Sequence, residues 1–259
     1  MGLKYYKGCE SLINGKIIAV RTNKTVYRDG DRCIKLFGEG YSKAGVFSEA
    51  LNLAYAEETG LNVPKVIDVT RIDGKWAIVT EFIEGKSLNQ LMEENPDKTG
   101  EYMELFTRLH IELGKKRCPM MCRVTDKITE KVRRSEMKAT LRFGLYSLLG
   151  SMEHEYDLCH GDFVPANVII GPDGKQNIID WSHAAAGPVA ADAAKTYLIL
   201  KVTNRTKEAE IYLKLFTEMS GIGEELIKKW IPLSAASYGI RGNEEEKRFI
   251  DACINLLGK

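Results

Sequence analysis

The most informative stretch of the sequence is His160-Gly161-Asp162-Phe163-Val164-Pro165-Ala166-Asn167. Thirteen residues after Asn167, Asp180 follows the apolar pair Ile178-Ile179. Transfer of a phosphoryl group to a hydroxyl needs a carboxylate that accepts the hydroxyl proton and oxygen ligands for Mg²⁺. We expect Asp162 to be that catalytic carboxylate. Asn167 and Asp180 are then the candidate catalytic metal ligands.

The residues between the two candidate ligands predict a β-hairpin. Val168–Ile170 is a short apolar run, Gly171–Gly174 has the composition of a turn, and Lys175–Ile179 predicts a second strand. A hairpin brings its ends together, so Asn167 and Asp180 should face each other across a gap that suits one or two Mg²⁺ ions. The alternative is a polar turn followed by ordinary hairpin ends, but the complete spacing favours the catalytic interpretation.

This loop resembles the catalytic loop of the protein-kinase-like superfamily, H-x-D-x-x-x-x-N before a metal-binding Asp. It is most similar to the aminoglycoside phosphotransferase and choline kinase family, which has H-G-D in the loop and I-D-W or I-D-F around the later Asp, as in Ile179-Asp180-Trp181 here. Most protein kinases have Arg where Gly161 stands and Gly where Ser182 stands. The resemblance therefore implies a small-molecule kinase that uses ATP and Mg²⁺.

The resemblance also implies an α+β fold with two lobes. Its N-lobe is a small antiparallel sheet with one main helix that binds the nucleotide, and we place it at residues 1–83. A hinge follows at 84–87. The larger, mostly helical C-lobe, with the catalytic loop and the acceptor pocket, then covers residues 88–259.

Two alternating runs, Lys24–Arg28 and Arg32–Phe37, predict a pair of strands joined by a turn at Gly30. Lys35 lies in the middle of the second strand, between Ile34 and Leu36. By resemblance it is the lysine that contacts the nucleotide phosphates. The alternative is a lysine that faces solvent on an edge strand.

The segment from Ser42 to Thr59 predicts a helix ended by Gly60, with an apolar face made of Val46, Phe47, Ala50, Leu51, Ala54 and Tyr55. The resemblance assigns Glu49 as the helix glutamate that pairs with Lys35. Glu57 and Glu58 are the competing carboxylates, but they fall in the last turn, where the helix dipole disfavours them.

Two further strands are expected at Leu61–Val69 and Trp76–Ile83, around a turn at Asp73-Gly74. The second leads into the hinge, where the resemblance places the adenine against backbone groups, the Glu81 carbonyl and the Ile83 amide. The loop Arg21–Lys24 has none of the repeated glycines of a protein-kinase phosphate loop. Thr22 and Asn23 are the candidates for holding the phosphates there.

Helices are predicted from Leu88 to Glu94 and from Glu101 to Leu113, and Val124–Met152 predicts a pair of turns or one long helix with Leu141, Leu145, Leu148 and Leu149 inside. By resemblance, Asp192 accepts backbone hydrogen bonds from the catalytic loop; the alternative is a surface helix cap. His160 is expected to fix the loop by bonding to backbone near Asp180. The remainder to residue 259 predicts helices with a loop at 238–243, which supplies much of the acceptor pocket.

Composition fits a globular enzyme of this kind. The chain has 259 residues and is 44% hydrophobic, with a net charge of +1 that gives no general support for nucleic-acid binding. No apolar run is long enough to cross a bilayer, and Met1–Tyr6 lacks a signal core, so we expect a cytoplasmic protein with reduced cysteines. Cys118 and Cys122 lack a second pair of ligands for zinc.

The acceptor is left open. The stretch from 108 to 142 is strongly basic; it favours a neutral or anionic acceptor if it faces the cleft, and says nothing about substrate if it is a solvated face. Glu153, Glu155 and Asp157, just before the loop, suit a cationic acceptor instead. The prediction is a kinase that transfers the γ-phosphate of ATP to the hydroxyl of a small molecule. An atypical protein kinase and a non-catalytic ATP sensor are the alternatives, and the oligomeric state is unknown.

Overall fold

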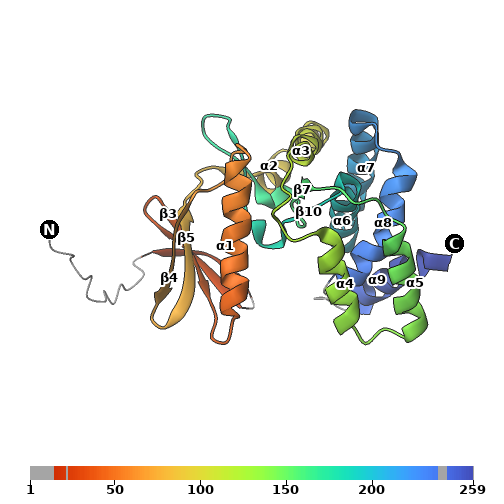
Figure 1. Ribbon diagram of the computed structural model, residues 1–259. Coiled ribbons are helices and arrows are strands. Elements are labelled where there is room, and N and C mark those ends of the chain that lie inside the picture. Colours follow the sequence, from red (N-terminus) through yellow and green to blue (C-terminus); the bar gives the residue numbers. More distant parts are fainter. Residues whose placement is uncertain (1–14, 22, 239–243, 259) are drawn as a thin grey trace.

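A computed structural model of the chain describes residues 15–21, 23–238 and 244–258. A curved sheet with one long helix forms one part, and a larger bundle of helices forms the other (Figure 1). This α+β arrangement in two lobes is the one that the sequence predicts. Among the described residues, no helix is long and apolar enough to cross a membrane.

The sheet of the N-lobe has five antiparallel strands in the order β1-β2-β3-β5-β4. Their bounds are β1 Lys16–Arg21, β2 Lys24–Asp29, β3 Arg32–Phe37, β4 Val66–Ile72 and β5 Lys75–Glu81. The predicted turn at Asp73-Gly74 joins β4 to β5, and both residues have positive φ, 49° and 77°. Two such residues form the tight hairpin turn whose twist matches the strands.

Helix α1 (Lys43–Glu58) begins after Ser42, whose Oγ accepts a hydrogen bond from the Gly45 amide, and it packs against β4 and β5. The predicted buried face is partly wrong. Phe47 and Leu51 are 46% and 50% exposed, whereas Glu49 and Asn52 are buried. The helix turns these polar residues inward because they have partners there; Asn52 Nδ2 donates to the Trp181 carbonyl at 3.3 Å.

The segment before β4 also differs from the prediction, which began this strand at Leu61. Pro64 has no N–H for the sheet ladder. Val63 instead packs into the core of the helical lobe, and the Asn62 carbonyl accepts a hydrogen bond from the Ile178 amide at 2.9 Å. Residues 61–64 therefore connect the two lobes rather than extend the sheet.

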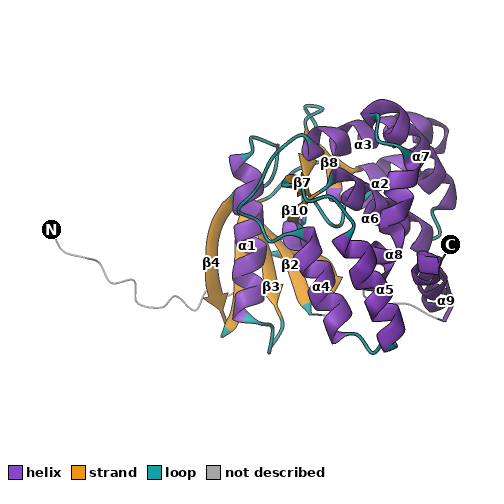
Figure 2. Cartoon of the chain, turned by 45° about the vertical axis from the view of Figure 1, so that its right-hand side comes forward, coloured by secondary structure: helices purple, strands orange, loops and turns teal. Residues whose placement is uncertain are grey.

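The C-lobe is helical, as the cartoon in Figure 2 shows. Its helices are α2 Leu88–Glu94, α3 Thr99–Gly114, α4 Val124–Arg134, α5 Ala139–Gly150, α6 Val189–Val202, α7 Thr206–Ser220, α8 Glu224–Ser237 and α9 Glu244–Ile254. The long helix considered for Val124–Met152 is thus two helices. The break follows Ser135, whose hydroxyl donates to the Val132 carbonyl and competes with the helical backbone bonds. Leu145 and Leu149 are buried, but Leu141 and Leu148 are only partly so.

Short strands between the lobes support the catalytic loop. The predicted hairpin is present as β8 (Val168–Ile170) and β9 (Gln176–Ile178), with β6 (Lys86–Ser87) on its outer side. Strand β7 (Asp157–Cys159) pairs with β10 (Ala185–Gly187). These two small sheets place the loop from 160 to 167 and the residues after β9 where the helical lobe meets α1.

Candidate active site

Asp192 on α6 holds the loop from 160 to 167 in place. Its Oδ2 accepts from the His160 amide at 2.6 Å and its Oδ1 from the Gly161 amide at 2.8 Å. His110 Nε2 lies 3.0 Å from Oδ2. Burial alone would raise the pKa of Asp192, but the hydrogen bond and charge of His110 lower it. Only 3% of Asp192 is exposed, so it is not a surface cap.

Gly161 has a conformation and an environment that exclude a side chain. Its φ is 75°, in the left-handed region that other L-residues enter at a cost. A Cβ atom at this position would lie 2.5 Å from the His183 carbonyl oxygen. The loop in this chain therefore cannot take the Arg that most protein kinases have at this place.

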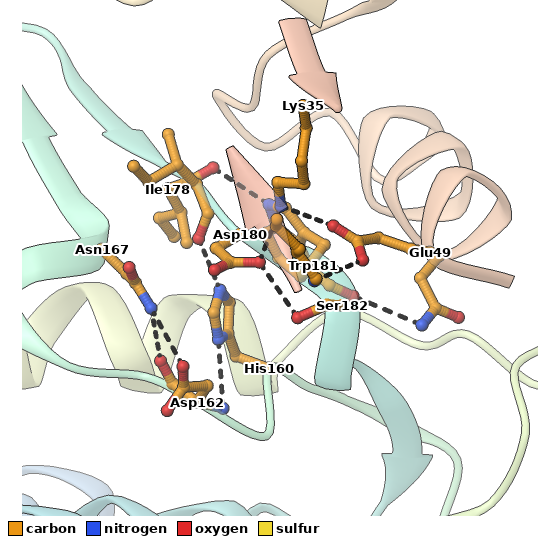
Figure 3. A network of polar contacts seen from close by, with 12 residues as sticks. Lys35, Glu49, His160, Asp162, Asn167, Ile178, Asp180, Trp181 and Ser182 are labelled. Carbon is orange, nitrogen blue, oxygen red and sulfur yellow. Dashed lines mark hydrogen bonds and ion pairs between the residues drawn. The ribbon is translucent and has the colours of Figure 1, made fainter. Parts of the chain in front are cut away.

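Asp162 and Asn167 are joined directly. Asn167 Nδ2 donates to the Asp162 carbonyl at 2.9 Å and approaches its Oδ2 at 3.5 Å. Figure 3 shows the Asn167 amide nitrogen turned toward Asp162 and its oxygen turned away. The amide oxygen is thereby left for another ligand.

Asp180 stands at the far end of the hairpin, as the sequence predicts. The Ile179 amide donates to the Asn167 carbonyl at 2.9 Å, and His160 Nε2 lies 3.0 Å from the Ile179 carbonyl. Burial lowers the pKa of His160, which favours a neutral ring at this backbone contact. Asp180 itself has φ 62° and ψ 67°, a left-handed conformation that is uncommon outside glycine. Strained backbone of this kind is frequent at functional sites.

The Asp180 carboxylate reaches the N-lobe. Its Oδ1 lies 3.1 Å from Lys35 Nζ and accepts from Ser182 Oγ at 3.0 Å. Burial would raise the pKa of Asp180, but the ammonium groups of Lys35 and Lys24 hold it well below its usual range. The carboxylate is therefore ionised and ready to bind a cation.

Lys35 pairs with Glu49 as the sequence predicts, with Nζ 2.5 Å from Oε1. Glu57 and Glu58 do not compete. Burial would lower the pKa of Lys35, but Asp180 and Glu49 raise it well above its usual range. The lysine stays charged between two carboxylates, and Figure 3 shows it between Glu49 and Asp180.

Lys24 is a residue that the sequence reasoning missed. Its Nζ lies 2.8 Å from Glu49 Oε2, so two lysines share one glutamate. The hairpin register contains the signal, because Val26 stands opposite Lys35 in the β2–β3 pair. Side chains alternate along a strand, which puts Lys24 on the same face as Val26 and therefore near Lys35.

The remaining nucleotide candidates are less defined. Thr22 lies outside the described residues. Asn23 is exposed in the turn before β2, where its carbonyl accepts from the Gly38 amide at 2.9 Å. Glu81 ends β5, and Ile83 follows it in the connection to the C-lobe. Within the described chain the Ile83 amide donates no backbone hydrogen bond, which leaves it available to a ligand.

The donor set fits a magnesium ion that is also bound by phosphate. Asp180 offers an ionised carboxylate and Asn167 an amide oxygen, and both are oxygen ligands of the kind Mg²⁺ prefers. The described residues contain no group of three or more His, Cys, Asp or Glu side chains able to hold a metal by themselves. A site of two protein ligands is what Mg²⁺ needs when nucleotide phosphates and water complete the shell.

A cavity of about 180 Å³ opens beside Asp162. It lies between α4, α6 and the end of α8, and Gly161 and Asp162 form part of its wall. The sequence predicts that the residues after Lys195 supply much of the acceptor pocket, and Ile199, Ser234, Ser237 and Tyr238 of that segment line this cavity. The loop residues 239–243, also expected there, lie outside the described chain.

Comparison with known proteins supports the same grouping. Residues 125–224 match the model of a family described as the phosphotransferase enzyme family. This confirms the resemblance to the aminoglycoside phosphotransferase family that the loop motif indicated. A search of curated proteins finds no match.

Several solved structures share the fold. Choline kinase LicA from Streptococcus pneumoniae matches with a TM-score of 0.62 at 17% identity, over 93% of this chain and 91% of that one. A choline/ethanolamine kinase family protein from Mesorhizobium loti matches at 0.61 and 16% identity, over 95% and 88%. A thermostable aminoglycoside phosphotransferase APH(4)-Ia, in a ternary complex with ADP and hygromycin B, matches at 0.68 and 13% identity, over 94% and 92%. The kinase-like fold is thereby confirmed.

Proposed function

From a chain that has the fold of choline kinases and aminoglycoside phosphotransferases and matches the phosphotransferase enzyme family over residues 125–224, we propose an ATP-dependent kinase that phosphorylates a hydroxyl of a small molecule. The observation that carries this proposal is one continuous network of contacts. It runs from Asp162 through Asn167, the hairpin and Asp180 to Lys35 and Glu49. Groups for the acceptor, the metal and the nucleotide thus form one site across both lobes.

Each residue of the network takes the role that its chemistry allows. Asp162 orients the acceptor hydroxyl and receives its proton, and Asn167 holds Asp162 in place. Lys35, fixed by Glu49, binds phosphate oxygens of the nucleotide. When bound, Mg²⁺ neutralises charge on the transferred phosphoryl group, and Asn167 Oδ1 and Asp180 would hold it. We assign the nucleotide to the lobe of residues 1–83, the hinge to 84–87 and the acceptor to the lobe of residues 88–259.

The reaction is a direct transfer. The acceptor oxygen forms a bond to the γ-phosphorus while the bond from that phosphorus to the β,γ-bridging oxygen breaks, which gives a phosphate monoester and ADP. The hydroxyl proton passes to Asp162. No covalent enzyme intermediate is needed.

The test is ADP release in the presence of Mg²⁺, measured with aminoglycosides, choline, sugars and hydroxy amino acids. One acceptor class should stimulate release above the rate without acceptor. Asp162→Asn should then lower the stimulated rate by about 10²- to 10⁴-fold, the usual contribution of a general base. The matched control is Asp173→Asn, which makes the same change at an exposed residue of the hairpin turn and should leave the rate unaltered. Full transfer by Asp162→Asn would contradict the assigned roles.

A further inference from the structure

The wall of the cavity beside Asp162 is cationic. Lys127 and Lys131 of α4 and Lys195 of α6 all line it. Residues four apart in a helix lie on the same face, so the two lysines of α4 point into the cavity together. Lys195 faces them from the neighbouring helix. The basic stretch between 108 and 142 thus reaches the cavity through these two of its members.

These three lysines lack counter-charges of their own. Within residues 15–21, 23–238 and 244–258, no carboxylate forms an ion pair with any of their ammonium groups. Lys127 Nζ donates to the carbonyls of His183 and Ala184, at 3.2 and 2.6 Å. Lys195 Nζ lies 6.0 Å from the centre of the Tyr238 ring.

The arginines at the two ends of α4 do form ion pairs. Arg123 pairs with Asp126, and both Arg133 and Arg134 pair with Glu130, at the surface of α4. Each of these arginines therefore has a carboxylate partner, with Glu130 shared by two of them. The unpaired charge of α4 is confined to the face that lines the cavity.

The carboxylates of the wall do not balance the lysines. Asp162 and Asp192 are the acidic residues among those that line the cavity. Asp192 already accepts from His160, Gly161 and His110, and Asp162 is the proposed acceptor of the hydroxyl proton. The acidic segment considered for a cationic acceptor, Glu153 to Asp157, does not line the cavity. A polycationic acceptor would find the lysines and few carboxylates.

The charge state of Lys195 agrees with this geometry. Burial lowers its pKa to about 8; Asp162 opposes the shift, and the charges of Lys131 and Lys127 add to it. Lys127 and Lys195 are partly buried whereas Lys131 is exposed, and like charges beside a buried ammonium group are unfavourable without an anion between them. A bound anion would relieve that repulsion, so the cavity favours an anionic ligand.

We infer that the acceptor of the proposed kinase carries an oxyanion, a carboxylate or a phosphate group, beside the hydroxyl that is phosphorylated. Lys131 and Lys195 bind the oxyanion, and the hydroxyl faces Asp162. The inference rests on the proposed function, whose transfer step it keeps unchanged.

The first experiment compares acceptors that differ in their charged group. Magnesium-dependent ADP release is measured with glycerate and glycerol 3-phosphate, with glycerol as their neutral analogue, and with homoserine, choline and hygromycin B. At least one oxyanion compound should exceed its neutral analogue in kcat/KM by about tenfold or more, the factor for one lost charge-assisted contact. Glycerate and glycerol 3-phosphate separate a carboxylate from a phosphate ligand. Preference for glycerol, choline or hygromycin B over every oxyanion compound would overturn the inference.

Variants locate the effect. Lys131→Met and Lys195→Met should each raise KM for the oxyanion acceptor by about tenfold and narrow its advantage over the neutral analogue. Lys207→Met, the same charge change on the exposed side of α7, should leave both constants unaltered. Equal KM values in Lys195→Met, Lys131→Met and wild type would show that the lysines do not bind the acceptor.

A binding measurement separates this inference from the proposed function. Calorimetric titration of glycerate and glycerol 3-phosphate into the wild type, with Mg²⁺ and ADP present, tests the cavity without turnover. The anion site would be supported and the kinase rejected by one result: both compounds bind, Lys131→Met and Lys195→Met weaken that binding, and the protein releases ADP with none of the acceptors. Turnover of uncharged acceptors, with no such binding, would keep the kinase and reject the anion site.

Discussion

Lysines lie on both sides of the loop from 160 to 167, but within the described chain those on one side form ion pairs with the protein and those on the other side do not. On the nucleotide side, Lys24 and Lys35 both contact Glu49, and Lys35 also contacts Asp180. On the acceptor side, Lys127, Lys131 and Lys195 line a cavity without an ion pair among the described residues. The first set is neutralised by the protein itself. The second set is left for the ligand to neutralise.

The difference between the paired and the unpaired lysines bears on how the nucleotide and the acceptor are recognised in the proposed function. In the proposed function, nucleotide phosphates bind together with Mg²⁺, and the carboxylates that fix the lysines would also bind the metal. The lysines of the cavity have no such task. An anion that enters the cavity would stabilise the lysine charges that have no ion pair among the described residues. The site is thus preorganised for the nucleotide and dependent on the acceptor for its charge balance.

Among the lysine substitutions, we expect the largest effect on activity from Lys35→Met. Loss of the cation between Glu49 and Asp180 should lower kcat/KM by about 10²- to 10³-fold, the usual effect of removing one group that stabilises developing charge. The loss should be the same for charged and uncharged acceptors, in contrast to Lys195→Met. Steady-state ADP release with both kinds of acceptor measures it. The control is Lys75→Met, at the half-buried start of β5, where Nζ lies 3.8 Å from the exposed Glu39.

A loss confined to oxyanion acceptors would place Lys35 at the acceptor and not at the nucleotide. The two sides of the loop would then not be electrostatically separate. The comparison would also be contradicted if Lys35→Met and Lys195→Met lowered kcat/KM equally for every acceptor.

Much of the nucleotide side could be predicted from the sequence because its partners sit on regular elements. Strand alternation and the hairpin turns placed Lys35 and Asp180 on their elements, and the resemblance to the kinase family assigned Glu49 on the predicted helix. Lys24 was missed although it obeys the same alternation, because the reasoning considered each strand singly. The prediction of the buried face of α1 was partly wrong because it also considered the helix by itself. Apolar spacing alone ignores Glu49 and Asn52, which are buried because residues far along the chain pair with them.

The acceptor side could not be predicted in this way. Lys127 and Lys131 are two members of a long basic stretch, and the sequence does not show which of its members face inward. That depends on the break after Ser135 and on the packing of α4 against α8. Lys195 lies far away in sequence, and only tertiary structure brings it beside α4. A cavity formed by three helices has no local motif.

Gly161 joins the two sides, and Gly161→Ala sharpens the comparison. A left-handed alanine costs ~1–2 kcal/mol, and its Cβ would press on the His183 carbonyl at 2.5 Å, so the loop must move. We expect Tm to fall by at least about 2–4 °C and transfer to drop by about tenfold. Thermal unfolding and ADP release measure the two effects. Both substrates should be affected, because the loop borders both.

Gly174→Ala is the matched control. Gly174 has nearly the same φ, 78°, but nothing lies within 4 Å of the position of its Cβ. It should show the backbone strain without the contact, and thus a smaller fall in Tm and normal transfer. Equal effects of the two substitutions would mean that the His183 contact does not determine the position of the loop.

The smallest expected effect is a pH dependence that differs between the two substrates. Burial and the neighbouring lysines set the pKa of Lys195 near 8, whereas Asp162 acts in the opposite direction, so about nine-tenths of Lys195 is charged at pH 7 and about one-tenth at pH 9. An anion binds the charged form, and it must therefore lose affinity as pH rises through 8. The groups around Lys195 that share this response are Lys127, Lys131, Asp162, Asp192 and His183.

We expect KM for an oxyanion acceptor to rise by about threefold between pH 7 and pH 9, since Lys195 supplies only part of the contact with the oxyanion. KM for ATP should be flat over the same range, because Asp180 and Glu49 raise the pKa of Lys35 despite its burial. Steady-state kinetics at fixed ionic strength give both profiles. Lys195→Met should flatten the acceptor profile, and Lys207→Met should leave it as in the wild type. A parallel rise in both KM values would assign the titration to a group that the two substrates share.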